Sequence, residues 1–408
     1  MGRYGLIGAK LSHSYSKPIH EMLGNPAYEY FELTPEGLRE FMLAKDFCAV
    51  NVTIPYKIDV MEYCDFISDE AQEIGCVNTI VNRNGVLYGY NTDAYGLEYV
   101  ARRAGIALKD KKIIILGSGG TSRTAKAVAK KCGCASLAVI SRTGEDNYTN
   151  LDRHADAEVL INTTPVGMYP NMDCAAVSLD IFPRLEGVID VIYNPSQTDL
   201  LFDARDRGIP YSNGLWMLVA QAKRAHELFF DTVVDDGIIE DITERLALGM
   251  KSIVLVGMPG AGKSTLGRLI AKELGLDFVD TDEIVAQMAG MSIPELIASK
   301  GEAHFRDVEA AAVRHAAHLP PCVIATGGGA IIRRENRRLL GRNATVILLD
   351  RPDESLATEG RPLSKDVETV RRLREQRRGF YEAVKDVRIE VDADCALTLQ
   401  RALKILKK

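Results

Sequence analysis

The sequence predicts an α/β protein that is built from two or three domains. Its 408 residues are too many for one typical core, since domains average about 150 residues. Short apolar runs alternate with stretches of helical periodicity, a pattern that indicates largely parallel sheets covered by helices. Two of the runs, residues 112–116 and 253–256, lead directly into glycine-rich turns at residues 117–120 and 257–262. Turns of this kind bind phosphate groups, so we expect two different nucleotide sites.

The composition excludes several classes of protein. A formal net charge of −6 and a pI near 5.8 argue against a nucleic-acid partner, which would require a clustered basic face. The eight cysteines show neither the paired spacing of a zinc site nor that of a small disulfide scaffold. No apolar run reaches membrane-spanning length, and the first residues carry no secretory signal pattern. We therefore expect a cytoplasmic protein with no membrane partner, and the oligomeric state is left open.

The elements of the first part of the chain can be placed in order. The apolar runs that predict strands lie at residues 4–7, 49–52, 113–116, 137–140, 159–161 and 188–191. Residues 215–230 predict a helix, because Leu218, Ala222, Ala225 and Phe229 recur at three- and four-residue steps. We expect this helix to pack one apolar face against the sheets.

The second glycine-rich turn defines a new domain, whose start we place between residues 249 and 250. Residues 257–264 match G-x-x-x-x-G-K-[ST] at every fixed position. The glycines let backbone N–H groups surround nucleotide phosphates, Lys263 adds a positive charge, and Ser264 offers a hydroxyl to Mg²⁺. The expected nucleotide-binding residues are Gly257, Gly260, Gly262, Lys263, Ser264 and Thr265. A phosphate loop alone fits many enzymes, from GTPases to adenylate kinases.

Other motifs narrow the function of this second part. Asp280 and Asp282 follow the apolar pair 278–279, so one carboxylate is expected to reach Mg²⁺ and the other a substrate hydroxyl. The motifs that come next are Arg306 with Glu309, Thr326-Gly327-Gly328-Gly329, Arg361-Pro362-Leu363, and Arg377 with Tyr381. Together, these features of residues 250–408 resemble shikimate kinase.

The resemblance to shikimate kinase implies a P-loop NTPase domain of the nucleoside monophosphate kinase type, which phosphorylates shikimate with Mg-ATP. It implies catalytic roles for Lys263, Asp282 and Arg361, the last as the lid arginine that closes over the phosphates. It also implies a metal site at Ser264 and Asp280. The residues expected to contact shikimate are Asp282, Arg306, Gly328 and Arg377. The two arginines suit the carboxylate of shikimate.

The lid departs from the family pattern. Shikimate kinases usually carry another arginine before the Arg-Pro-Leu element, whereas this chain reads Glu354-Ser355-Leu356-Ala357-Thr358-Glu359. We therefore expect weaker discrimination between ATP and GTP. The alternative is a surface loop that has lost the lid's role.

The first glycine-rich turn has the context of a dinucleotide site. Gly117, Gly119 and Gly120 follow a predicted strand and precede a predicted helix at residues 124–131, although Ser122 stands where G-x-G-x-x-G has its third glycine. The next strand ends in Ser141-Arg142-Thr143, where NAD-selective folds often carry an acid. The arginine indicates NADP(H), because it can meet a 2′-phosphate.

An ordered set of motifs resembles shikimate dehydrogenase over nearly all of residues 1–249. The motifs are Ser14 and Ser16, and residues 51–57, 77–79, 91–93, 162–165, 193–195 and 213–221. The resemblance implies a substrate domain at 1–98 and 216–249 and a Rossmann NADP domain at 99–215. It places Ser14, Ser16, Thr53, Lys57, Asn78, Asp93 and Gln221 in the substrate pocket. It places Gly117, Gly119, Gly120, Arg142, Thr143, Asn162, Thr163, Tyr193 and Gly214 at the cofactor.

The resemblance makes Lys57 and Asp93 the catalytic pair. Hydride transfer to a ketone leaves charge on the oxygen, which a protonated Lys57 can neutralise, and such acid–base help is typically worth about 10²–10⁴-fold. Taken alone, Lys57 would be a solvated lysine and Asp93 a helix N-cap. The family often has a second arginine shortly after the first, whereas Arg142 is followed by Gly144-Glu145-Asp146. NADP preference is therefore expected to be softened, unless Arg123 compensates.

Together the two resemblances imply a bifunctional enzyme. It would reduce 3-dehydroshikimate to shikimate with NADPH and then phosphorylate shikimate with ATP and Mg²⁺. One alternative is quinate use by the first part, which differs by a ring hydroxyl. Another is a ligand-sensing regulator without catalysis, against which the presence of Lys57, Asp93, Lys263, Asp280 and Asp282 argues.

Overall fold

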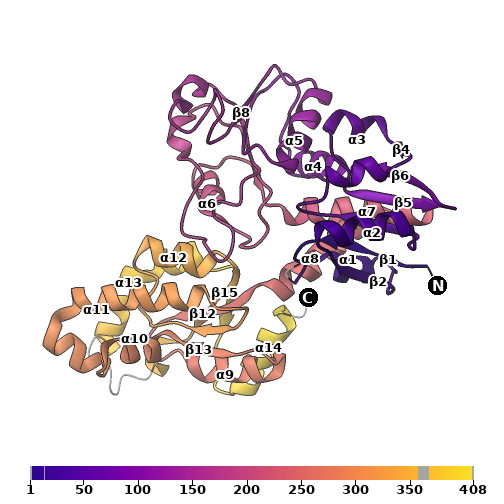
Figure 1. Cartoon of the computed structure of the whole chain (residues 1–408). Helices are drawn as coiled ribbons and strands as arrows, with labels where there is room; N and C mark the ends of the chain where they lie inside the picture. The colour runs from indigo at the N-terminus through magenta and orange to yellow at the C-terminus, as the bar shows by residue number, and fades with distance from the viewer. Residues whose placement is uncertain (1, 13, 357–366, 407–408) are drawn as a thin grey trace. The chain divides into compact units, whose positions relative to one another are not determined.

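The computed structural model describes residues 2–12, 14–356 and 367–406 and divides the chain into two compact units, Met1–Leu246 and Ala247–Lys408 (Figure 1). The division falls within helix α8 (Gly237–Met250), so the acidic stretch before the second glycine-rich loop is largely helical. Each unit has its own core and is described separately. None of the helices in the described ranges combines the length and apolarity needed to cross a membrane.

The first sheet of unit one is mixed, in the order β2-β1-β3-β5-β6-β4. Its strands are β1 (Tyr4–Gly8), β2 (Tyr28–Glu32), β3 (Ala49–Val52), β4 (Phe66–Ile67), β5 (Thr79–Arg83) and β6 (Val86–Tyr90). The β3–β5 and β5–β6 pairs are antiparallel. The β5–β6 hairpin turns at Asn84 and Gly85, which have φ of 54° and 88°. Positive φ at both turn positions is the geometry that Asn-Gly hairpins favour.

The second sheet of unit one is parallel throughout, in the order β11-β10-β9-β7-β8. Its strands are β7 (Lys112–Leu116), β8 (Ser136–Ile140), β9 (Val159–Asn162), β10 (Gly187–Asp190) and β11 (Tyr211–Ser212). Successive residues of β7 enter different cores, Ile113 and Ile115 in one and Ile114 and Leu116 in the other. A strand buried on both faces reads as an unbroken apolar run, which is why β7, β9 and β10 were predictable, whereas the two-residue strand β11 was not predicted.

Helices cover both sheets of unit one. They are α1 (Ser16–Met22), α2 (Pro35–Ala44), α3 (Asp69–Ile74), α4 (Asp93–Arg103), α5 (Gly120–Lys131), α6 (Asp199–Asp206) and α7 (Leu215–Phe230), with 3₁₀ turns η1 (Asp59–Tyr63), η2 (Leu151–His154) and η3 (Leu179–Ile181). Helix α7 has the bounds that the apolar spacing predicts, and Ala222, Ala225 and Phe229 are buried in it. It packs along α4, so the substrate-side motifs on the two helices become neighbours.

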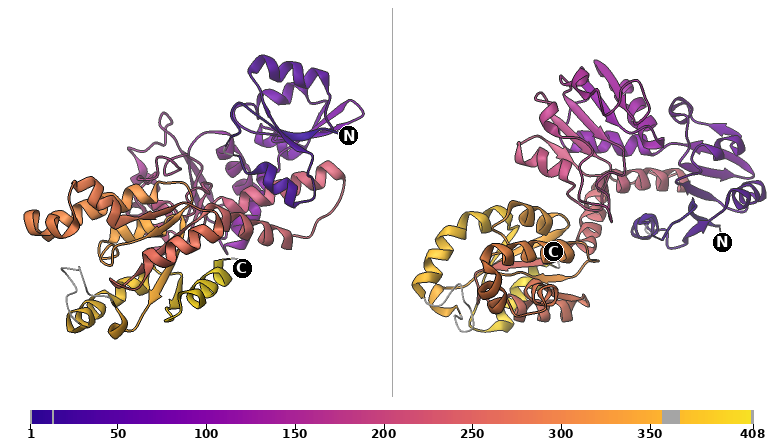
Figure 2. Two further views of the ribbon diagram at one scale, coloured as in Figure 1. Left: turned by 90° about the horizontal axis from the view of Figure 1, so that it is seen from below. Right: turned by 60° about the vertical axis from the view of Figure 1, so that its left-hand side comes forward.

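Unit two contains a five-stranded parallel sheet in the order β13-β14-β12-β15-β16. Its strands are β12 (Ser252–Gly257), β13 (Phe278–Asp280), β14 (Val323–Ala325), β15 (Ala344–Asp350) and β16 (Val387–Glu390). Its helices are α9 (Lys263–Leu274), α10 (Thr281–Ala289), α11 (Ile293–Ala317), α12 (Arg334–Gly341), α13 (Val367–Val384) and α14 (Cys395–Leu406), with η4 at Asp353–Ser355. Helices lie on both sides of this sheet (Figure 2). The glycine-rich loop follows the central strand β12.

A buried histidine lies in unit one, away from the predicted sites. His20 of α1 is fully buried and stacks on Tyr28, with ring centroids 4.1 Å apart. Neither ring nitrogen has a hydrogen-bond partner among the described residues. Burial lowers the pKa of His20 from its ordinary 6.5 to about 3, and the charge of His226 adds to this effect. His20 is therefore neutral in the folded chain at any pH above about 3.

This burial predicts a pH-dependent stability. Below pH 6.5 the unfolded chain protonates His20 and the folded chain does not, so the free energy of unfolding should fall by up to about 1.4 kcal/mol per pH unit between pH 6.5 and 5. His20→Phe should flatten this slope, whereas His315→Phe, at an exposed position of unit two, should not. Urea unfolding followed by the fluorescence of Trp216, the single tryptophan, reports on unit one. Equal slopes in the His20→Phe variant and the unchanged chain would contradict the prediction.

Candidate active sites

The phosphate loop of unit two connects β12 to α9. Gly260 and Gly262 have φ of 85° and 91°, a region that strongly favours glycine. A Cβ on Gly257 would lie 2.6 Å from the carbonyl oxygen of Leu349 on β15, so this position also has no room for a side chain. The loop can therefore turn its backbone N–H groups toward one point, at the N-terminus of α9.

Lys263 is fixed against the loop that it belongs to. Its side-chain ammonium donates hydrogen bonds of 2.9 Å to the carbonyl oxygens of both Gly257 and Met258. The residue is buried, yet it lines the cavity next to the loop. A positive charge is thus held where the outer phosphates of a nucleotide would lie.

Ser264 and Asp280 form an oxygen-rich pair beside the loop. The Ser264 hydroxyl donates a 2.6 Å hydrogen bond to one carboxylate oxygen of Asp280, and the other accepts from the backbone N–H of Asp282 and caps α10. Mg²⁺ is usually held by one or two protein oxygens plus water and phosphate oxygens. The pair therefore fits Mg²⁺ bound together with a nucleotide.

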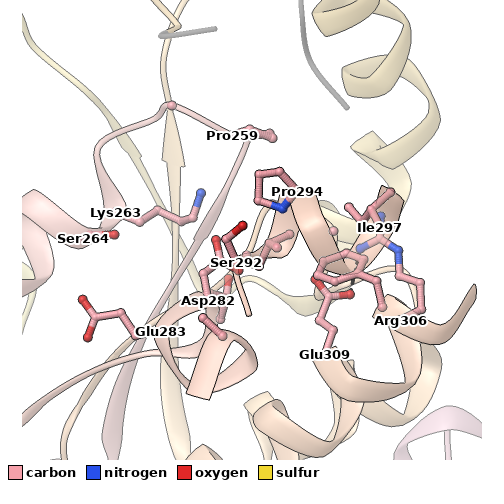
Figure 3. Close-up of a pocket in the computed structure, with 18 of the residues that line it drawn as sticks. Pro259, Lys263, Ser264, Asp282, Glu283, Ser292, Pro294, Ile297, Arg306 and Glu309 are labelled. Carbon is pink, nitrogen blue, oxygen red and sulfur yellow. Dashed lines mark hydrogen bonds and ion pairs between the residues drawn. The ribbon is translucent and has the colours of Figure 1, made fainter. Parts of the chain in front are cut away.

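A cavity of about 810 Å³ extends from the phosphate loop to the start of α11. Figure 3 shows Lys263 and Ser264 on one side of it, Arg306 and Glu309 on the other, and Asp282 between them. Thr265, Gly328 and Arg377 line it as well. The structure thus brings the predicted nucleotide and acceptor residues of unit two around one space.

Arg306 is held in this cavity by two carboxylates. Its guanidinium contacts Glu309 at 2.7 Å and Glu302 at 3.0 Å. Burial lowers the pKa of Arg306, but the charges and hydrogen bonds of the two glutamates outweigh it and raise the pKa overall. Burial raises the pKa of Glu309. The pair presents a fixed guanidinium rather than a mobile one.

Arg377 reaches the same wall of the cavity from α13. Its guanidinium donates a 3.0 Å hydrogen bond to the carbonyl oxygen of Gly328, which also accepts from the Tyr381 hydroxyl at 2.7 Å. Burial lowers the pKa of Arg377. Two guanidinium groups in one cavity suit an anionic acceptor such as a carboxylate.

The three glycines at 327–329 allow these side chains to lie close to the backbone. A Cβ on Gly327 would be 2.6 Å from an Asp282 carboxylate oxygen, and a Cβ on Gly329 would be 2.2 Å from a guanidinium nitrogen of Arg306. A Cβ on Gly328 would meet Pro259 of the phosphate loop at 2.6 Å. The run is thus required because polar groups and the loop occupy the space of its side chains.

One residue predicted for this cavity lies outside the described residues, and several residues that line the cavity were not predicted. The predicted lid arginine, Arg361, lies outside the described residues, as do residues 357–359 of the stretch expected to weaken nucleotide discrimination. Arg351, Ser292, Pro294 and Ile297 line the cavity, and the sequence analysis missed them. For Arg351, the available signal was its position shortly after the apolar run 346–349, a run that was not itself predicted to be a strand.

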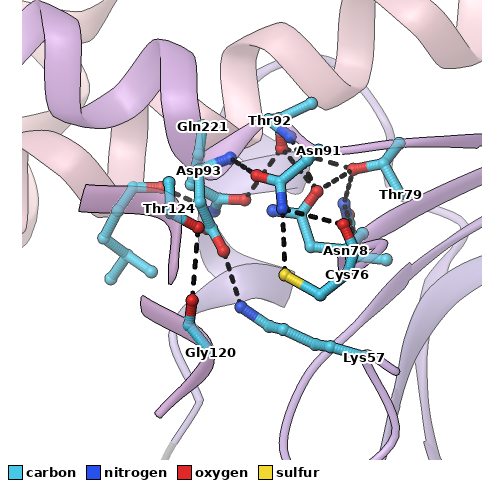
Figure 4. Close-up of polar contacts among 12 residues, drawn as sticks. Lys57, Cys76, Asn78, Thr79, Asn91, Thr92, Asp93, Gly120, Thr124 and Gln221 are labelled. Carbon is cyan, nitrogen blue, oxygen red and sulfur yellow. Dashed lines mark hydrogen bonds and ion pairs between the residues drawn. The ribbon is translucent and has the colours of Figure 1, made fainter. Parts of the chain in front are cut away.

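In unit one, Lys57 and Asp93 form an ion pair (Figure 4). The Lys57 ammonium lies 2.7 Å from the Asp93 carboxylate, and only 17% and 12% of the two side chains are exposed. The reading of Lys57 as a solvated lysine is therefore wrong. The reading of Asp93 as an N-cap is also wrong, since Thr92 is the N-cap of α4 and makes no side-chain cap bond.

The electrostatics of the pair keep the lysine charged. Burial lowers the pKa of Lys57, but the charge and hydrogen bond of Asp93 outweigh it and raise the pKa above its usual 10.5. Lys57 is therefore protonated at neutral pH and can donate a proton to an atom beside it.

Asparagine side chains fix the start of α4, which carries Asp93. Asn78 accepts hydrogen bonds from the backbone N–H of Thr92 at 2.8 Å and from the Thr79 hydroxyl at 3.0 Å. Asn91 accepts from the Asp93 backbone N–H at 3.1 Å. The predicted residue Asn78 thus lies within this network, next to the ion pair (Figure 4).

The other predicted substrate residues surround the same region. Gln221 of α7 accepts a 3.4 Å hydrogen bond from the Thr92 hydroxyl. The hydroxyls of Ser14 and Ser16, which follow β1, are 3.2 Å apart. Thr53 follows β3, the neighbour of β1, and its N–H bonds the carbonyl oxygen of Ile7. Adjacent parallel strands end at one edge of a sheet, so these hydroxyls are carried to the same edge.

The first glycine-rich turn leads into α5 with an open N-terminus. Gly117 has φ of 103°, and a Cβ there would be 2.8 Å from the Thr163 hydroxyl. A Cβ on Gly119 or Gly120 would meet nothing within 4 Å, which leaves room for phosphates above the helix end. Ser122, in the place of the third glycine, donates a 2.6 Å hydrogen bond to the Gly117 carbonyl. The substitution therefore closes the turn rather than disrupting it.

Asp190 connects two of the predicted cofactor segments and was not singled out from the sequence. Its carboxylate accepts from the Asn162 side chain at 3.0 Å, the Ile192 N–H at 3.1 Å and the Thr198 hydroxyl at 2.7 Å. Burial raises its pKa to about 6. Asn162 is fully buried, so its side chain fixes the turn that carries Thr163.

The remaining residues expected at the cofactor are Gly214, near the Tyr193 segment, and Arg142 and Thr143, after β8; Arg123 was named as a residue that would compensate for a missing arginine. Gly214 has no space for a side chain, since a Cβ would lie 1.9 Å from the carbonyl oxygen of Val191, two residues before Tyr193. Arg142 and Thr143 are exposed after β8. The Arg123 guanidinium lies against Gly75, at 3.4 Å from the position of a Cβ, so its side chain is directed at the end of α3.

Comparisons with known proteins match different families to the two units of the chain. The family model described as shikimate kinase matches residues 259–407, and that described as the shikimate dehydrogenase substrate binding domain matches residues 6–80. A shikimate dehydrogenase (NADP(+)) of Clostridium beijerinckii is 38% identical over 258 residues, which are 59% of this chain and 96% of the relative. One from Clostridium perfringens is 36% identical over 273 residues, covering 60% and 98%.

Solved structures give the same result for the first part. Shikimate dehydrogenase 1 from Peptoclostridium difficile is 39% identical with a TM-score of 0.56, covering 60% of this chain and 98% of that chain. A chorismate mutase/shikimate 5-dehydrogenase fusion protein from Clostridium acetobutylicum is 35% identical with a TM-score of 0.57, covering 60% and 97%. Shikimate 5-dehydrogenase of Thermus thermophilus, in complex with NADP(H) and shikimate, is 29% identical with a TM-score of 0.55, covering 60% and 99%.

The glycine run predicts a specific stability effect. Gly329→Ala should displace the Arg306 guanidinium and leave Glu309 buried with a weakened partner, which should lower the free energy of unfolding of unit two by about 1–3 kcal/mol. Gly341→Ala is the matched control, because a Cβ there meets nothing within 4 Å. Urea unfolding followed by circular dichroism measures both, and equal stabilities of the two variants would refute the packing argument.

Proposed function

Because this chain belongs to the shikimate dehydrogenase family and carries a shikimate kinase domain after it, we propose that it reduces 3-dehydroshikimate to shikimate with NADPH and then phosphorylates shikimate at its 3-hydroxyl with Mg-ATP. It is a bifunctional enzyme of the shikimate pathway. The observation that supports both steps most directly is that each unit contains an assembled site. Unit one has the Lys57–Asp93 ion pair, and unit two has a phosphate loop with the Ser264–Asp280 pair.

In the reduction, Lys57 is the proton donor. NADPH supplies the hydride when bound, and charge then develops on the carbonyl oxygen of the substrate. A protonated Lys57, held by Asp93 at 2.7 Å, donates its proton to that oxygen and is the general acid of the step. The other residues proposed to line the substrate pocket are Ser14, Ser16, Thr53, Asn78 and Gln221, whose hydroxyl and amide groups suit a hydroxylated ring acid.

The proposed cofactor residues follow the strands of the parallel sheet of unit one, and different strands supply the residues for different parts of NADPH. The open N-terminus of α5 at Gly119 and Gly120 binds the pyrophosphate, below which Gly117 makes the tight turn. Arg142, with Thr143, meets the phosphate on the adenosine ribose. Thr163, Tyr193 and Gly214 shape the nicotinamide side, and Asn162 acts through its bond to Asp190.

In the phosphorylation, the residues of unit two position two anions and neutralise charge. The loop glycines Gly257, Gly260 and Gly262, with Lys263 and Thr265, hold the nucleotide. Ser264 and Asp280 would hold Mg²⁺, which lowers the charge on the phosphates. Asp282 orients the acceptor hydroxyl or accepts its proton, while Arg306, Arg377 and the Gly328 backbone bind shikimate. Arg361 is proposed to close over the phosphates.

We assign the substrate domain to residues 1–98 and 216–249, the NADP domain to 99–215 and the kinase domain to 250–408. A hydrogen bond to α4 supports the first grouping. Tyr95, on the part of α4 that lies within residues 1–98, donates a 2.7 Å hydrogen bond to Asp236, just before α8. This bond ties the segment before α8 to the helix that carries Asp93.

The function is tested by a mass-resolved product assay. Purified protein receives 3-dehydroshikimate, Mg-ATP and either NADPH or NADH, with quinate as a parallel substrate. Shikimate 3-phosphate formed with NADPH is the expected result. Shikimate without phosphate would refute the kinase step, and tight shikimate binding without turnover would indicate a ligand-sensing protein instead.

Removing the proposed proton donor should affect one activity only. Lys57→Met should lower kcat of the dehydrogenase by about 10²–10⁴-fold and leave the kinase rate unchanged. Lys109→Met, at an exposed position, is the control and should leave both rates unchanged. A dehydrogenase rate in Lys57→Met within threefold of the unchanged chain would rule out the proton-donor role.

The cofactor preference should depend on Arg142. Arg142→Ala should raise KM for NADPH by about tenfold, because a charge-assisted hydrogen bond to phosphate is lost, and should leave KM for NADH unchanged. Arg184→Ala, also exposed, should change neither. An unchanged KM for NADPH in Arg142→Ala would refute the role of this arginine.

A further inference from the structure

Arg351 is a cation of the unit-two cavity that neither the motifs nor the proposed roles use. It follows directly after Asp350, the last residue of β15, and its side chain lines the cavity with Lys263, Arg306 and Arg377. Strand β15 runs parallel to β12, with Leu349 beside Gly257 in register. Arg351 therefore lies two residues beyond the strand position that faces the first glycine of the phosphate loop.

The sheet order assigns Arg351 to one side of that loop. In the order β13-β14-β12-β15-β16, Asp282 follows β13 and Gly328 follows β14, so these two proposed shikimate residues follow strands on one side of β12. Arg377 of α13 reaches Gly328 through its 3.0 Å hydrogen bond. Arg351 comes from the strand on the other side of β12. Strand β12, which leads into the phosphate loop, therefore lies between the strand that precedes Arg351 and those that precede Asp282 and Gly328.

Neighbouring arginines contact carboxylates, whereas the Arg351 guanidinium contacts none in the part of the chain that the structure describes. Arg374 contacts Asp350 and Asp353, each at 2.6 Å, and Arg388 also contacts Asp350. In contrast, the Arg351 guanidinium has no hydrogen bond or ion pair within residues 14–356 and 367–406. In these ranges only the backbone carbonyl of Arg351 is bonded, and it accepts a hydrogen bond from Arg374. Its backbone carbonyl is therefore bound by Arg374, while its guanidinium is unpartnered among the described residues.

The other cations of the cavity have partners already. Arg306 is bound to Glu302 and Glu309, Arg377 to the Gly328 carbonyl, and Lys263 to two loop carbonyls. A planar guanidinium without a carboxylate partner beside a phosphate loop suits bidentate binding of phosphate oxygens.

We propose that Arg351 binds the outer phosphates of the nucleotide from the β15 side of the phosphate loop. It is a binding residue for the phosphoryl donor, and it follows a strand on the other side of β12 from the strands that precede Asp282 and Gly328. This inference rests on the proposed phosphorylation of shikimate by Mg-ATP and adds to it a contact that sets affinity for the triphosphate.

The test uses the full chain with Mg-ATP and shikimate. Arg351→Ala should raise KM for ATP by roughly 10- to 100-fold and leave KM for shikimate unchanged, and Arg351→Lys should fall between it and the unchanged chain, because charge is kept but the fork is lost. Inorganic tripolyphosphate, used as an inhibitor competitive with ATP, should lose affinity by the same factor in Arg351→Ala. Arg371→Ala, an exposed arginine paired with Glu354 at 2.7 Å, is the control and should behave as the unchanged chain.

The outcomes separate this inference from the proposed function. If the unchanged chain forms no shikimate 3-phosphate, the proposed kinase step fails. If it does, an unchanged KM for ATP in Arg351→Ala overturns the inference, as does a rise in KM for shikimate alone. A raised KM for ATP with unchanged inhibition by tripolyphosphate also overturns it, because the contact would then be with the base or ribose. Arg351→Lys could also show a normal KM for ATP while Arg351→Ala is inactive. That result would mean that the alanine variant is misfolded and that the planar guanidinium is not needed, so it also counts against the inference.

Discussion

The geometry of both units depends on the fact that neighbouring parallel strands end at the same edge of a sheet. In unit two the phosphate loop, the Asp280–Asp282 pair, the glycine run and Arg351 each follow a different strand, and they meet at one cavity because those strands are adjacent. In unit one the turn at Gly117, the Thr163 segment and the Tyr193 segment follow β7, β9 and β10 in the same way. Residues that are far apart in the sequence are thus collected without any long loop.

The close approach of other groups to the backbone at several glycines is the second constraint on both sites. At Gly214 and Gly257 a methyl group would overlap a carbonyl oxygen of a neighbouring segment, and at Gly327 and Gly329 it would overlap the carboxylate and guanidinium that define the cavity. Positive charges such as Arg306 and Lys57 are placed in partly buried positions only because each has a carboxylate beside it. An unpaired buried charge would cost several kcal/mol.

Much of this arrangement could be predicted from the sequence, and the residues show why. Strands such as β7 and β9 are buried on both faces and appear as unbroken apolar runs, and α7 has one periodic apolar face. The phosphate loop was found because its spacing is fixed, whereas Lys57 and Asp93 were found because the ordered motifs that contain them resemble shikimate dehydrogenase. The roles of Asp190 and Arg351 could not be predicted, because each is a single charged residue at a strand end, and its meaning comes from neighbours in other strands. Helix α8 was not predicted, since its position depends on contacts such as that between Arg103 and Glu240.

The hydrogen bonds that Lys263 makes to its own loop reduce the side-chain entropy that is lost when a phosphate group binds. A free lysine side chain loses rotamer freedom worth up to about 2 kcal/mol when it becomes fixed. In this chain the two carbonyl oxygens of Gly257 and Met258 already fix the ammonium, so that loss belongs to the folding of unit two. The arrival of a nucleotide then requires little further ordering of the lysine, and its affinity reflects contacts more than the restriction of motion.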